Sequence, residues 1–396
     1  MRHVVTLNAG SSSIKFALFA CDGPDPVPLA TGLAETTGTG RHLRVQYGDG
    51  APMHDISWTA DTPFHTDALT RVLEWRRGAF PDANVVAAGH RVVHGGVNFD
   101  VPLVVTPIVL TELQALIPLA PLHQPHNIAG ILAAQEAWPH VQQVACFDTA
   151  FHRAHPFVND TFALPRRFYD EGVRRYGFHG LSYEYVTRRL SEIAPLHAAG
   201  RVVVAHLGNG ASMCAIRDGQ SVASSMGFTA LDGLPMGTRS GQLDPGVVLY
   251  LIAQHGMSAA EVSDLLYRES GLKGLSGLSH DMRVLEASDS REAAEAIDYF
   301  VFRIRRELGG LAAVLGGLDA MVFCGGIGEH AWRIRQRVLE GMEWLGIELD
   351  ASANRASAQV ISSDRSRARV FVLPTDEEAM IARHTLEALS SAPGTV

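Results

Sequence analysis

The sequence predicts an α/β protein made of two domains, and three observations support this prediction. The 396 residues are more than one ordinary hydrophobic core serves. Apolar, strand-like runs alternate with segments that begin in helix-capping residues. A strand–turn–strand pattern at the start of the chain returns after residue 200, as expected of two related halves.

The repeated pattern has two copies of similar order. The first copy is a strand, a turn and a second strand: Val4–Leu7, Asn8–Ser13 and the alternating run from Ile14. The second copy has the same parts: Val202–Leu207, Gly208–Ser212 and Met213–Ile216. Alternation in the second strand of the first copy turns Lys15 away from the apolar face. We interpret the pattern as a weak internal repeat, although coincidence between two hairpins would explain it better if it stood alone.

The remaining elements follow from capping signals and apolar runs. Helices are expected to begin at Thr106-Pro107, at Asp244-Pro245, at the capping box Ser258–Glu261, at Asp289 and at Thr375, where Glu378 completes a second capping box. Further strands are expected at Val85–Val93, Val141–Phe147, Ala320–Cys324 and Val370–Leu373. No long linker separates the halves, and we expect a domain boundary near residues 150–155.

Composition and charge exclude several classes of protein. The net charge of −9 argues against a basic surface for nucleic acid. The four cysteines show no CxxC spacing, which favours buried reduced thiols. No secretory signal and no membrane-spanning run are present, so we expect a cytoplasmic protein with no membrane partner.

Four turns rich in glycine or hydroxyl residues each follow a predicted strand, and they indicate phosphate binding. They are Asn8–Ser13, Gly208–Ser212, Met236–Gly241 and Gly325–Glu329. Glycine lets backbone N–H groups approach a phosphate closely. The last turn also precedes a helix expected near Ala331, whose N-terminus favours anions. The P-loop pattern GxxxxGKS/T and a complete GxGxxG pattern are both absent, which excludes those two nucleotide sites.

Two arginines, one aspartate and one histidine stand where a ligand could be bound. Arg91 interrupts an apolar strand and Arg239 lies in a Gly/Ser turn, whereas an ordinary arginine is a solvated surface charge. Asp148 ends a strand, where it can orient substrate or partner a metal; an N-cap role is about equally supported. His179, between Phe178 and Gly180, could donate to a phosphoryl group or be a packed turn residue.

These motifs together resemble the acetate kinases, the acetokinase family of the actin- and hexokinase-like superfamily. The matching segments, in chain order, are LNAGSSSIKF, GHRVVHGG, APLHQPHN, CFDTAFH, RYGFHGLSYEYV, AHLGNGAS, SMGFTALDGLPMGTRSGQLDP, GLSGLSHDMR, FCGGIGEH and LPTDEEAMIA. The resemblance implies two duplicated ribonuclease H-like, actin-like ATPase lobes with a cleft between them. It implies an acyl-substrate lobe over 1–152, completed by the C-terminal helix 376–396, and a nucleotide-binding lobe over 153–375.

The resemblance also assigns roles to individual residues. Asn8 and Glu377 match metal-associated positions, and Arg91 matches the acyl-substrate arginine. Asp148 matches the catalytic acidic residue, with proton exchange and orientation both left open. His179 and Arg239 match positions that stabilise the transition state. The matched ATP-binding positions are Lys15, His206, Leu207, Gly208, Asn209, Gly210, Asp281, Met282, Arg283, Gly325, Gly326, Ile327, Gly328 and Glu329.

The implied reaction is reversible, Mg²⁺-dependent transfer of the ATP γ-phosphoryl group to acetate, giving acetyl phosphate and ADP, with Mn²⁺ as an alternative metal. The family also suggests a homodimer. A propionate or butyrate kinase is the nearest alternative; a sugar or polyol kinase and a non-catalytic, chaperone-like ATP-binding module are more distant ones. The chain departs from the family pattern at Val97, Gln124, Gln242, His330 and Asp376, which leaves the fine tuning of metal, base and acyl preference open.

Overall fold

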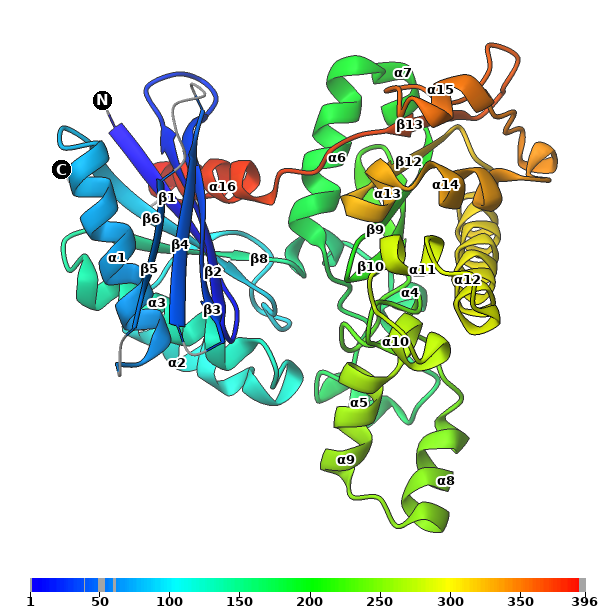
Figure 1. The fold of residues 1–396 in the computed structure, drawn as a ribbon, viewed down its shortest axis with the longest axis horizontal. Coiled ribbons are helices and arrows are strands. Elements are labelled where there is room, and N and C mark those ends of the chain that lie inside the picture. Colours follow the sequence, from blue (N-terminus) through cyan, green and yellow to red (C-terminus); the bar gives the residue numbers. More distant parts are fainter. Residues whose placement is uncertain (1, 39, 49–53, 60–61, 392–396) are drawn as a thin grey trace. The chain divides into compact units, whose positions relative to one another are not determined.

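The computed structural model describes residues 2–38, 40–48, 54–59 and 62–391 (Figure 1). The chain forms two compact units. Unit 1 comprises Met1–Ala150 and Asp376–Val396, and unit 2 comprises Phe151–Thr375. Each unit contains one β-sheet with helices packed against it, so the predicted α/β class is confirmed.

The sheet of unit 1 has the order β5-β4-β3-β2-β1-β6-β8-β7. Its strands are β1 (Arg2–Ala9), β2 (Ser13–Ala20), β3 (Val27–Thr37), β4 (Gly40–Tyr47), β5 (His54–Trp58), β6 (Asn84–Val92), β7 (Leu103–Val104) and β8 (Gln142–Phe147). Strand β1 runs antiparallel to β2 and parallel to β6, and β6 runs parallel to β8. The carboxyl ends of β1, β6 and β8 therefore share one edge of the sheet, where active sites of α/β proteins are usual.

Helices cover both faces of this sheet because its central strands are apolar on both sides. The helices of unit 1 are α1 (Phe64–Ala79), α2 (Pro107–Ala115), the short 3₁₀ helix Ile117–Leu119, α3 (Gln124–Ala137) and α16 (Glu377–Ser391). On one face Val5 and Leu7 pack in a core with α1 and α3. On the other face Val4 and Phe19 pack with Ala382 of α16, which brings the end of the chain back to β1.

The sheet of unit 2 repeats the central part of the first. Its strands are β9 (Arg201–Leu207), β10 (Ala211–Arg217), β11 (Gln220–Ser224), β12 (Ala320–Cys324) and β13 (Arg369–Val372), in the order β11-β10-β9-β12-β13. Strand β9 is antiparallel to β10 and parallel to β12, and β12 is parallel to β13. This is the arrangement of β3-β2-β1-β6-β8, so the interpretation of the weak repeat as two related halves is confirmed.

Helices α6 and α12 pack against the sheet of unit 2 (Figure 1). The α-helices of this unit are α4 (Phe157–Asp160), α5 (Arg166–Asp170), α6 (Gly180–Ile193), α7 (Pro195–Ala198), α8 (Pro245–His255), α9 (Ala259–Asp264), α10 (Gly271–Ser276), α11 (Met282–Glu286), α12 (Arg291–Leu315), α13 (Gly325–His330), α14 (Trp332–Leu339) and α15 (Ala351–Arg355). Shorter turns are the 3₁₀ helices Ala150–His152 and Glu343–Leu345 and the π-helix Leu265–Glu269. Within the described ranges, no helix combines the length and apolarity needed to cross a bilayer.

Most predicted helix starts are confirmed by their caps. Thr106 accepts from the Val109 amide and Asp244 from the Gly246 amide, and Ser258 and Glu261 form the full capping box. The long helix α12 begins two residues later than expected, because Ser290 is its cap. These signals are local, so the sequence reveals them directly.

Two predictions at helix starts were wrong. Asp376 Oδ1, and not Thr375, accepts from the Ala379 amide at 2.9 Å, while Thr375 Oγ1 lies 2.7 Å from Ser182 Oγ. The expected turn Gly325–Glu329 is itself helical, as α13. Gly325 has φ +75°, and this left-handed residue lets the helix start directly after β12.

Candidate active site

The first group of predicted site residues meets at the carboxyl edge of the sheet in unit 1. Arg91 lies on β6, Asp148 follows β8, Asn8 lies near the end of β1, and Glu377 opens α16. Arg91 Nε donates to Asp148 Oδ1 at 3.0 Å and Nη2 donates to Oδ2. Arg91 Nη1 donates to Asn8 Oδ1 at 3.3 Å, and Nε lies 3.6 Å from Glu377 Oε2. The structure thus brings together four residues that are far apart in the sequence.

Charge and burial at this edge are unusual. The Asp148 side chain is only 1% exposed, whereas that of Arg91 is 20% exposed. Burial raises the pKa of Asp148, Arg91 opposes that rise and Glu377 adds to it. Burial also tends to lower the pKa of Arg91, but Asp148 and Glu377 outweigh burial and raise it. The ion pair is therefore held in its charged form at an edge where carboxylates are crowded.

Two further charges complete this edge. Burial and the neighbouring Glu377 raise the pKa of Glu378, and Lys15 counteracts this rise. Lys15 itself is exposed on β2 and belongs to unit 1. Three carboxylates, those of Asp148, Glu377 and Glu378, thus face two cationic side chains.

The side chains at this edge could hold a hard divalent cation. Among the residues that the structure describes, no three His, Cys, Asp or Glu side chains form a complete metal cage. Mg²⁺ needs no such cage, because it commonly takes one or two carboxylates and completes its shell with water and phosphate oxygens. The amide oxygen of Asn8, the carboxylate of Glu377 and the local acidic excess suit this kind of binding.

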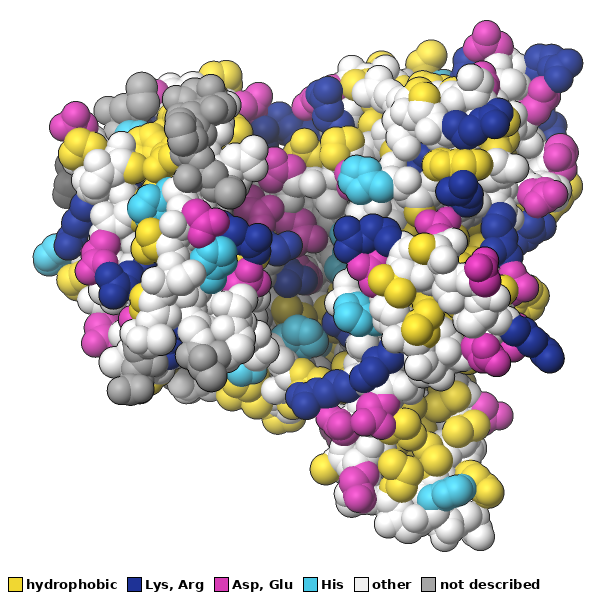
Figure 2. Space-filling model, viewed as in Figure 1, with side chains coloured by type: hydrophobic (Ala, Val, Ile, Leu, Met, Phe, Trp, Pro, Cys, Tyr) yellow, Lys and Arg dark blue, Asp and Glu magenta, His cyan; other side chains and the backbone are white. Residues whose placement is uncertain are grey.

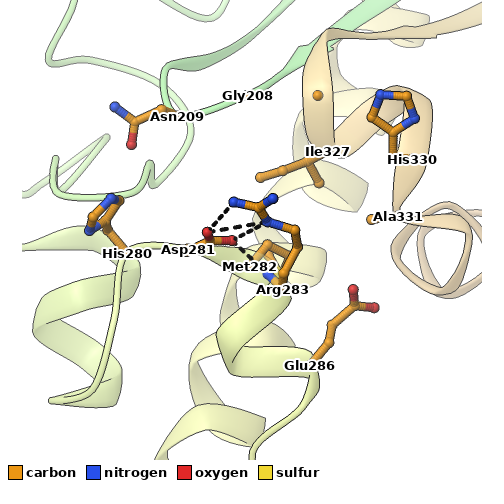
Figure 3. A pocket seen from close by; sticks show the side chains of 11 residues that line it. Gly208, Asn209, His280, Asp281, Met282, Arg283, Glu286, Ile327, His330 and Ala331 are labelled. Carbon is orange, nitrogen blue, oxygen red and sulfur yellow. Dashed lines mark hydrogen bonds and ion pairs between the residues drawn. The ribbon is translucent and has the colours of Figure 1, made fainter. Parts of the chain in front are cut away.

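In unit 2, a cavity of about 590 Å³ is formed between the turn after β9, helix α11 and the region of α13 (Figure 3). This volume is within the usual range for small-ligand pockets. Its lining residues are Gly208, Asn209, His280, Asp281, Met282, Arg283, Glu286, Gly326, Ile327, His330 and Ala331. Polar groups from Asn209 and Arg283 and the apolar side chain of Ile327 all line the same space, as recognition of a nucleotide would require.

Asp281 and Arg283 form a pair at the cavity wall. Arg283 Nε and Nη2 donate to the Asp281 carboxylate at 3.0 and 2.6 Å, and the carboxylate also caps α11 by accepting from the Arg283 amide at 2.9 Å. These hydrogen bonds lower the pKa of Asp281 to about 2. The pair is exposed, so its guanidinium can exchange partners at little cost.

The predicted ATP-binding residues divide into two sets. Seven of them line the cavity: Gly208, Asn209, Asp281, Met282, Arg283, Gly326 and Ile327. Six others in unit 2 do not line it: His206, Leu207, Gly210, Gly325, Gly328 and Glu329. Four lining residues were not among the predicted site residues: His280, Glu286, His330 and Ala331. They could have been found from their neighbours, since His280 precedes Asp281, Glu286 is one helical turn after Arg283, and His330 follows Glu329.

His179 and Arg239 approach each other over Gly210. A Cβ atom added at Gly210 would lie 3.1 Å from His179 Nε2 and 4.0 Å from Arg239 Nη1. The His179 ring stacks on His206 at 4.3 Å, and its Nδ1 is 2.8 Å from Ser212 Oγ. Arg239 Nη1 donates to the Ala230 carbonyl at 3.1 Å. The Arg239 guanidinium and the His179 imidazole therefore both lie beside Gly210, in the turn next to the cavity.

Comparison with known proteins agrees with this geometry. The family model described as the acetokinase family matches residues 3–383. An acetate kinase from Methylocella silvestris is 73% identical over 98% of each chain, and one from Rhodopseudomonas palustris is 53% identical over 96% of this chain and 97% of its own.

Solved structures give the same result. Porphyromonas gingivalis acetate kinase has a TM-score of 0.89 at 38% identity, and a Francisella tularensis propionate kinase has a TM-score of 0.91 at 36% identity. Both matches cover 98% of this chain and 100% of the other. The chain belongs to the acetokinase family.

Proposed function

We propose that this protein catalyses the reversible transfer of the γ-phosphoryl group of ATP to acetate, giving acetyl phosphate and ADP. The observation that carries the proposal is the 73% identity, over 98% of both chains, to an acetate kinase. In this proposal the residues that hold the acyl acid belong to unit 1, and the residues that line the nucleotide cavity belong to unit 2. The need for ATP also supports the cytoplasmic location expected from the sequence.

Arg91 is the proposed binding group for the carboxylate. Its guanidinium is partly exposed, while Asp148 holds it from the buried side through two hydrogen bonds. The hydrogen bonds to Asp148 and Asn8 leave one N–H on each of Nη1 and Nη2 of Arg91, and this planar pair can bind a substrate carboxylate in bidentate fashion. The acid is ionised at neutral pH, so little base catalysis is needed. In this proposal Asp148 fixes the orientation of Arg91.

His179 and Arg239 are the proposed groups that stabilise the transferring phosphoryl group. Negative charge spreads over its equatorial oxygens in the transition state, and preorganised donors lower the barrier there. The two side chains approach the same face of Gly210, which leaves room for an anion because glycine has no side chain. The cavity lined by Asn209, Arg283 and Ile327 is the proposed nucleotide site.

Asn8 and Glu377 are the proposed ligands of Mg²⁺, or of Mn²⁺ in its place. A divalent cation supplies charge neutralisation to the phosphate oxygens. The Arg91 guanidinium already neutralises Asp148, so the bound cation does not have to neutralise this carboxylate as well. Dependence of turnover on added Mg²⁺ after treatment with EDTA tests this assignment.

Propionate is the second candidate for the acid that is phosphorylated, because one of the similar structures is a propionate kinase. One methylene changes binding by only about 1–3 kcal/mol, so both acids can react. The test is trapping with hydroxylamine in the presence of ATP and Mg²⁺, with acetate, propionate, butyrate and glycerol in parallel. An acyl phosphate gives a hydroxamate, whereas a polyol phosphate does not. We expect acetate to give a hydroxamate. The proposal is refuted if none of the three acids gives one.

Variants at Arg239 test the role of this residue. Arg239→Gln removes the charge beside Gly210, and we expect kcat to fall about 10²-fold or more with little change in the KM for acetate. Arg188→Gln, on the exposed side of α6, is the matched control and should retain normal turnover. Normal turnover of Arg239→Gln would end its assignment.

We further propose a homodimer in which α8 of two copies meets. None of the residues of α8 is buried, although its sequence is predominantly apolar. Leu249 and Tyr250 are 66% and 55% exposed, with Val247 and Ile252 also exposed. Figure 2 shows apolar side chains gathered on the part of unit 2 that carries α8 and α9. An apolar helix that its own chain leaves uncovered is typical of an interface between copies of one chain.

Light scattering after size-exclusion chromatography tests the dimer. Leu249→Glu should shift the protein from dimer to monomer, because it buries a charge in the proposed interface. Leu196→Glu, at a leucine on α7 that is even more exposed, is the control and should leave the mass unchanged. A monomeric wild type, or a Leu249→Glu variant that stays dimeric, would contradict the α8 interface.

A further inference from the structure

A buried chain of hydrogen bonds in unit 2 has no part in the mechanism above. His152 is fully buried, its Nε2 lies 3.0 Å from the Phe178 carbonyl oxygen, and its Nδ1 lies 2.7 Å from Ser221 Oγ. His155 Nε2 lies 2.7 Å from the same hydroxyl, and Cys214 Sγ lies 3.2 Å from it. The side chains of His152, His155 and Cys214 thus meet at the Ser221 hydroxyl. Among these residues, His152 makes the link to the carbonyl of Phe178, the residue that precedes His179.

The positions of the protons in this series of hydrogen bonds follow from the one atom that can only accept, the Phe178 carbonyl oxygen. A carbonyl oxygen can only accept, so His152 Nε2 carries the hydrogen and Nδ1 is an acceptor. The single hydroxyl proton of Ser221 is then donated to His152 Nδ1, and His155 Nε2 donates to the Ser221 oxygen. The chain therefore fixes one tautomer of a neutral imidazole, and its N–H is directed at the Phe178 carbonyl.

Burial supports this neutral state. Burial lowers the pKa of His152 to about 4, and the hydrogen bond to the Phe178 carbonyl opposes this. Burial, together with His152, Arg153 and Arg175, lowers the pKa of His155 to about 3. Both rings stay uncharged at neutral pH, and the directed N–H is always present there.

The segment that this N–H holds has a special backbone. Gly177 has φ +74°, and a Cβ atom at this position would lie 2.5 Å from His152 Cδ2, so the segment packs directly on the imidazole ring. His179 follows with φ 59° and ψ 25°, the left-handed conformation, which is unfavourable for a residue other than glycine. Such a conformation persists only where its surroundings over-determine it.

We propose that His152 is a positioning residue that acts through His179. Its Nε2–H holds the Phe178 carbonyl, and this contact keeps Gly177–His179 in the conformation that directs the His179 ring towards Gly210. Ser221 is the partner that fixes the tautomer. This inference rests on the proposed role of His179, and it extends the site to residues that touch no substrate.

Kinetic variants test the inference. His152→Phe keeps a ring but removes the donor, and we expect kcat to fall about tenfold to a hundredfold with KM values for acetate and ATP within about twofold. His152→Gln can place an N–H near Nε2 and should recover most of the lost turnover. His197→Phe, at a half-buried histidine of the same unit that contacts Phe371, is the control and should keep normal kcat.

A double-mutant cycle separates positioning from general stability. In a His179→Ala background, His152→Phe should reduce the remaining kcat by less than about twofold, because the residue through which it acts is gone. An equal loss in both backgrounds, or no loss in the wild-type background, would overturn the inference. If His152→Phe does not fold, Ser221→Ala takes its place in the same cycle with the same criteria.

A readout that does not depend on activity keeps this inference separate from the proposed function. Hydrogen exchange of the backbone amides in 176–180 should quicken in His152→Phe and not in His197→Phe. If the wild type forms no hydroxamate, the proposed function fails and exchange still decides the role of His152. If the wild type is active, His179→Ala is impaired and His152→Phe matches the wild type in turnover and exchange, the inference alone fails.

Discussion

Removing the Arg91 guanidinium should destabilise the protein as well as impair it, because Asp148 would remain buried without its partner. We consider Arg91→Met, which keeps most of the apolar volume of the side chain. The Asp148 carboxylate is 1% exposed and accepts two hydrogen bonds from Arg91. Glu377 lies close to the same site and would repel the orphaned charge.

The expected size follows from this burial. Breaking a buried ion pair by removing one partner costs about 3–5 kcal/mol. A loss of that size lowers the thermal midpoint by about 6–20 °C for units of this length. Adding Asp148→Asn removes the buried charge and keeps a polar group of equal size. The double variant Arg91→Met/Asp148→Asn should therefore regain most of the midpoint, although it stays inactive.

Arg383→Met is the matched control in the same unit. Arg383 is about as exposed as Arg91 and its Nη1 lies 2.6 Å from Asp25 Oδ1, but Asp25 is 58% exposed. Its loss leaves a solvated carboxylate and should cost no more than about 1 kcal/mol. Differential scanning fluorimetry compares the three variants with the wild type. Equal midpoints for Arg91→Met and Arg383→Met, or no recovery in the double variant, would refute the reasoning.

Two more predictions concern pH and Gly210. Burial lowers the pKa of His90 in the folded protein from its ordinary value of 6.5 to about 4. As the pH falls below about 6.5, this histidine is therefore protonated in the unfolded chain before it is protonated in the folded protein. The stability that this neutral histidine contributes is complete above pH 6.5 and decreases towards pH 4, with about 2 kcal/mol lost by pH 5. His90→Gln should therefore shrink the difference in thermal midpoint between pH 7.5 and pH 5, and an unchanged difference would contradict this. Gly210→Ala places a methyl group 3.1 Å from His179 Nε2, so kcat should fall with the thermal midpoint preserved, whereas normal turnover would show that no anion uses this surface.

Local sequence patterns predicted the strands, turns and helix starts that depend on interactions between residues close together in the sequence. The two hairpins share apolar alternation and a glycine-rich turn, and the sheet of unit 2 repeats the order of the five strands β3-β2-β1-β6-β8 of unit 1. Arg91 and Asp148 were recognisable as site candidates because a charge inside or at the end of an apolar strand needs a partner. The parallel pairing of β6 with β8 then brings them together.

The features that the sequence did not reveal depend on distant contacts. Thr375 looks like a helix cap, but Ser182, which lies 193 residues away, takes its hydroxyl, and the capping passes to Asp376. The chain from Ser221 through His152 to Phe178 joins segments 69 and 26 residues apart. No pattern in one segment can reveal such contacts, because each partner alone looks like an ordinary buried polar residue.

Gly89 opens the segment GHRVVHGG, but the sequence gives no sign of the packing contact through which this glycine supports the site. A Cβ atom at Gly89 would lie 2.1 Å from Thr385 Oγ1 and 2.7 Å from Ile381 Cγ2, both on α16. These distances are too short to be accommodated, so Gly89→Ala must displace the helix that begins with Glu377. We expect a loss of about 1–3 kcal/mol from overpacking and a higher apparent KM for Mg²⁺.

Two companion variants make this prediction specific. Gly78→Ala, on α1 of the same unit, meets no atom within 4 Å and should raise stability slightly, because alanine is the better helix former. Thr385→Ala removes the nearest obstacle, so Gly89→Ala/Thr385→Ala should recover part of both the thermal midpoint and the Mg²⁺ dependence. A Gly89→Ala protein with the wild-type midpoint and Mg²⁺ dependence would mean that α16 yields freely, and that its close approach to β6 does not determine where Glu377 lies.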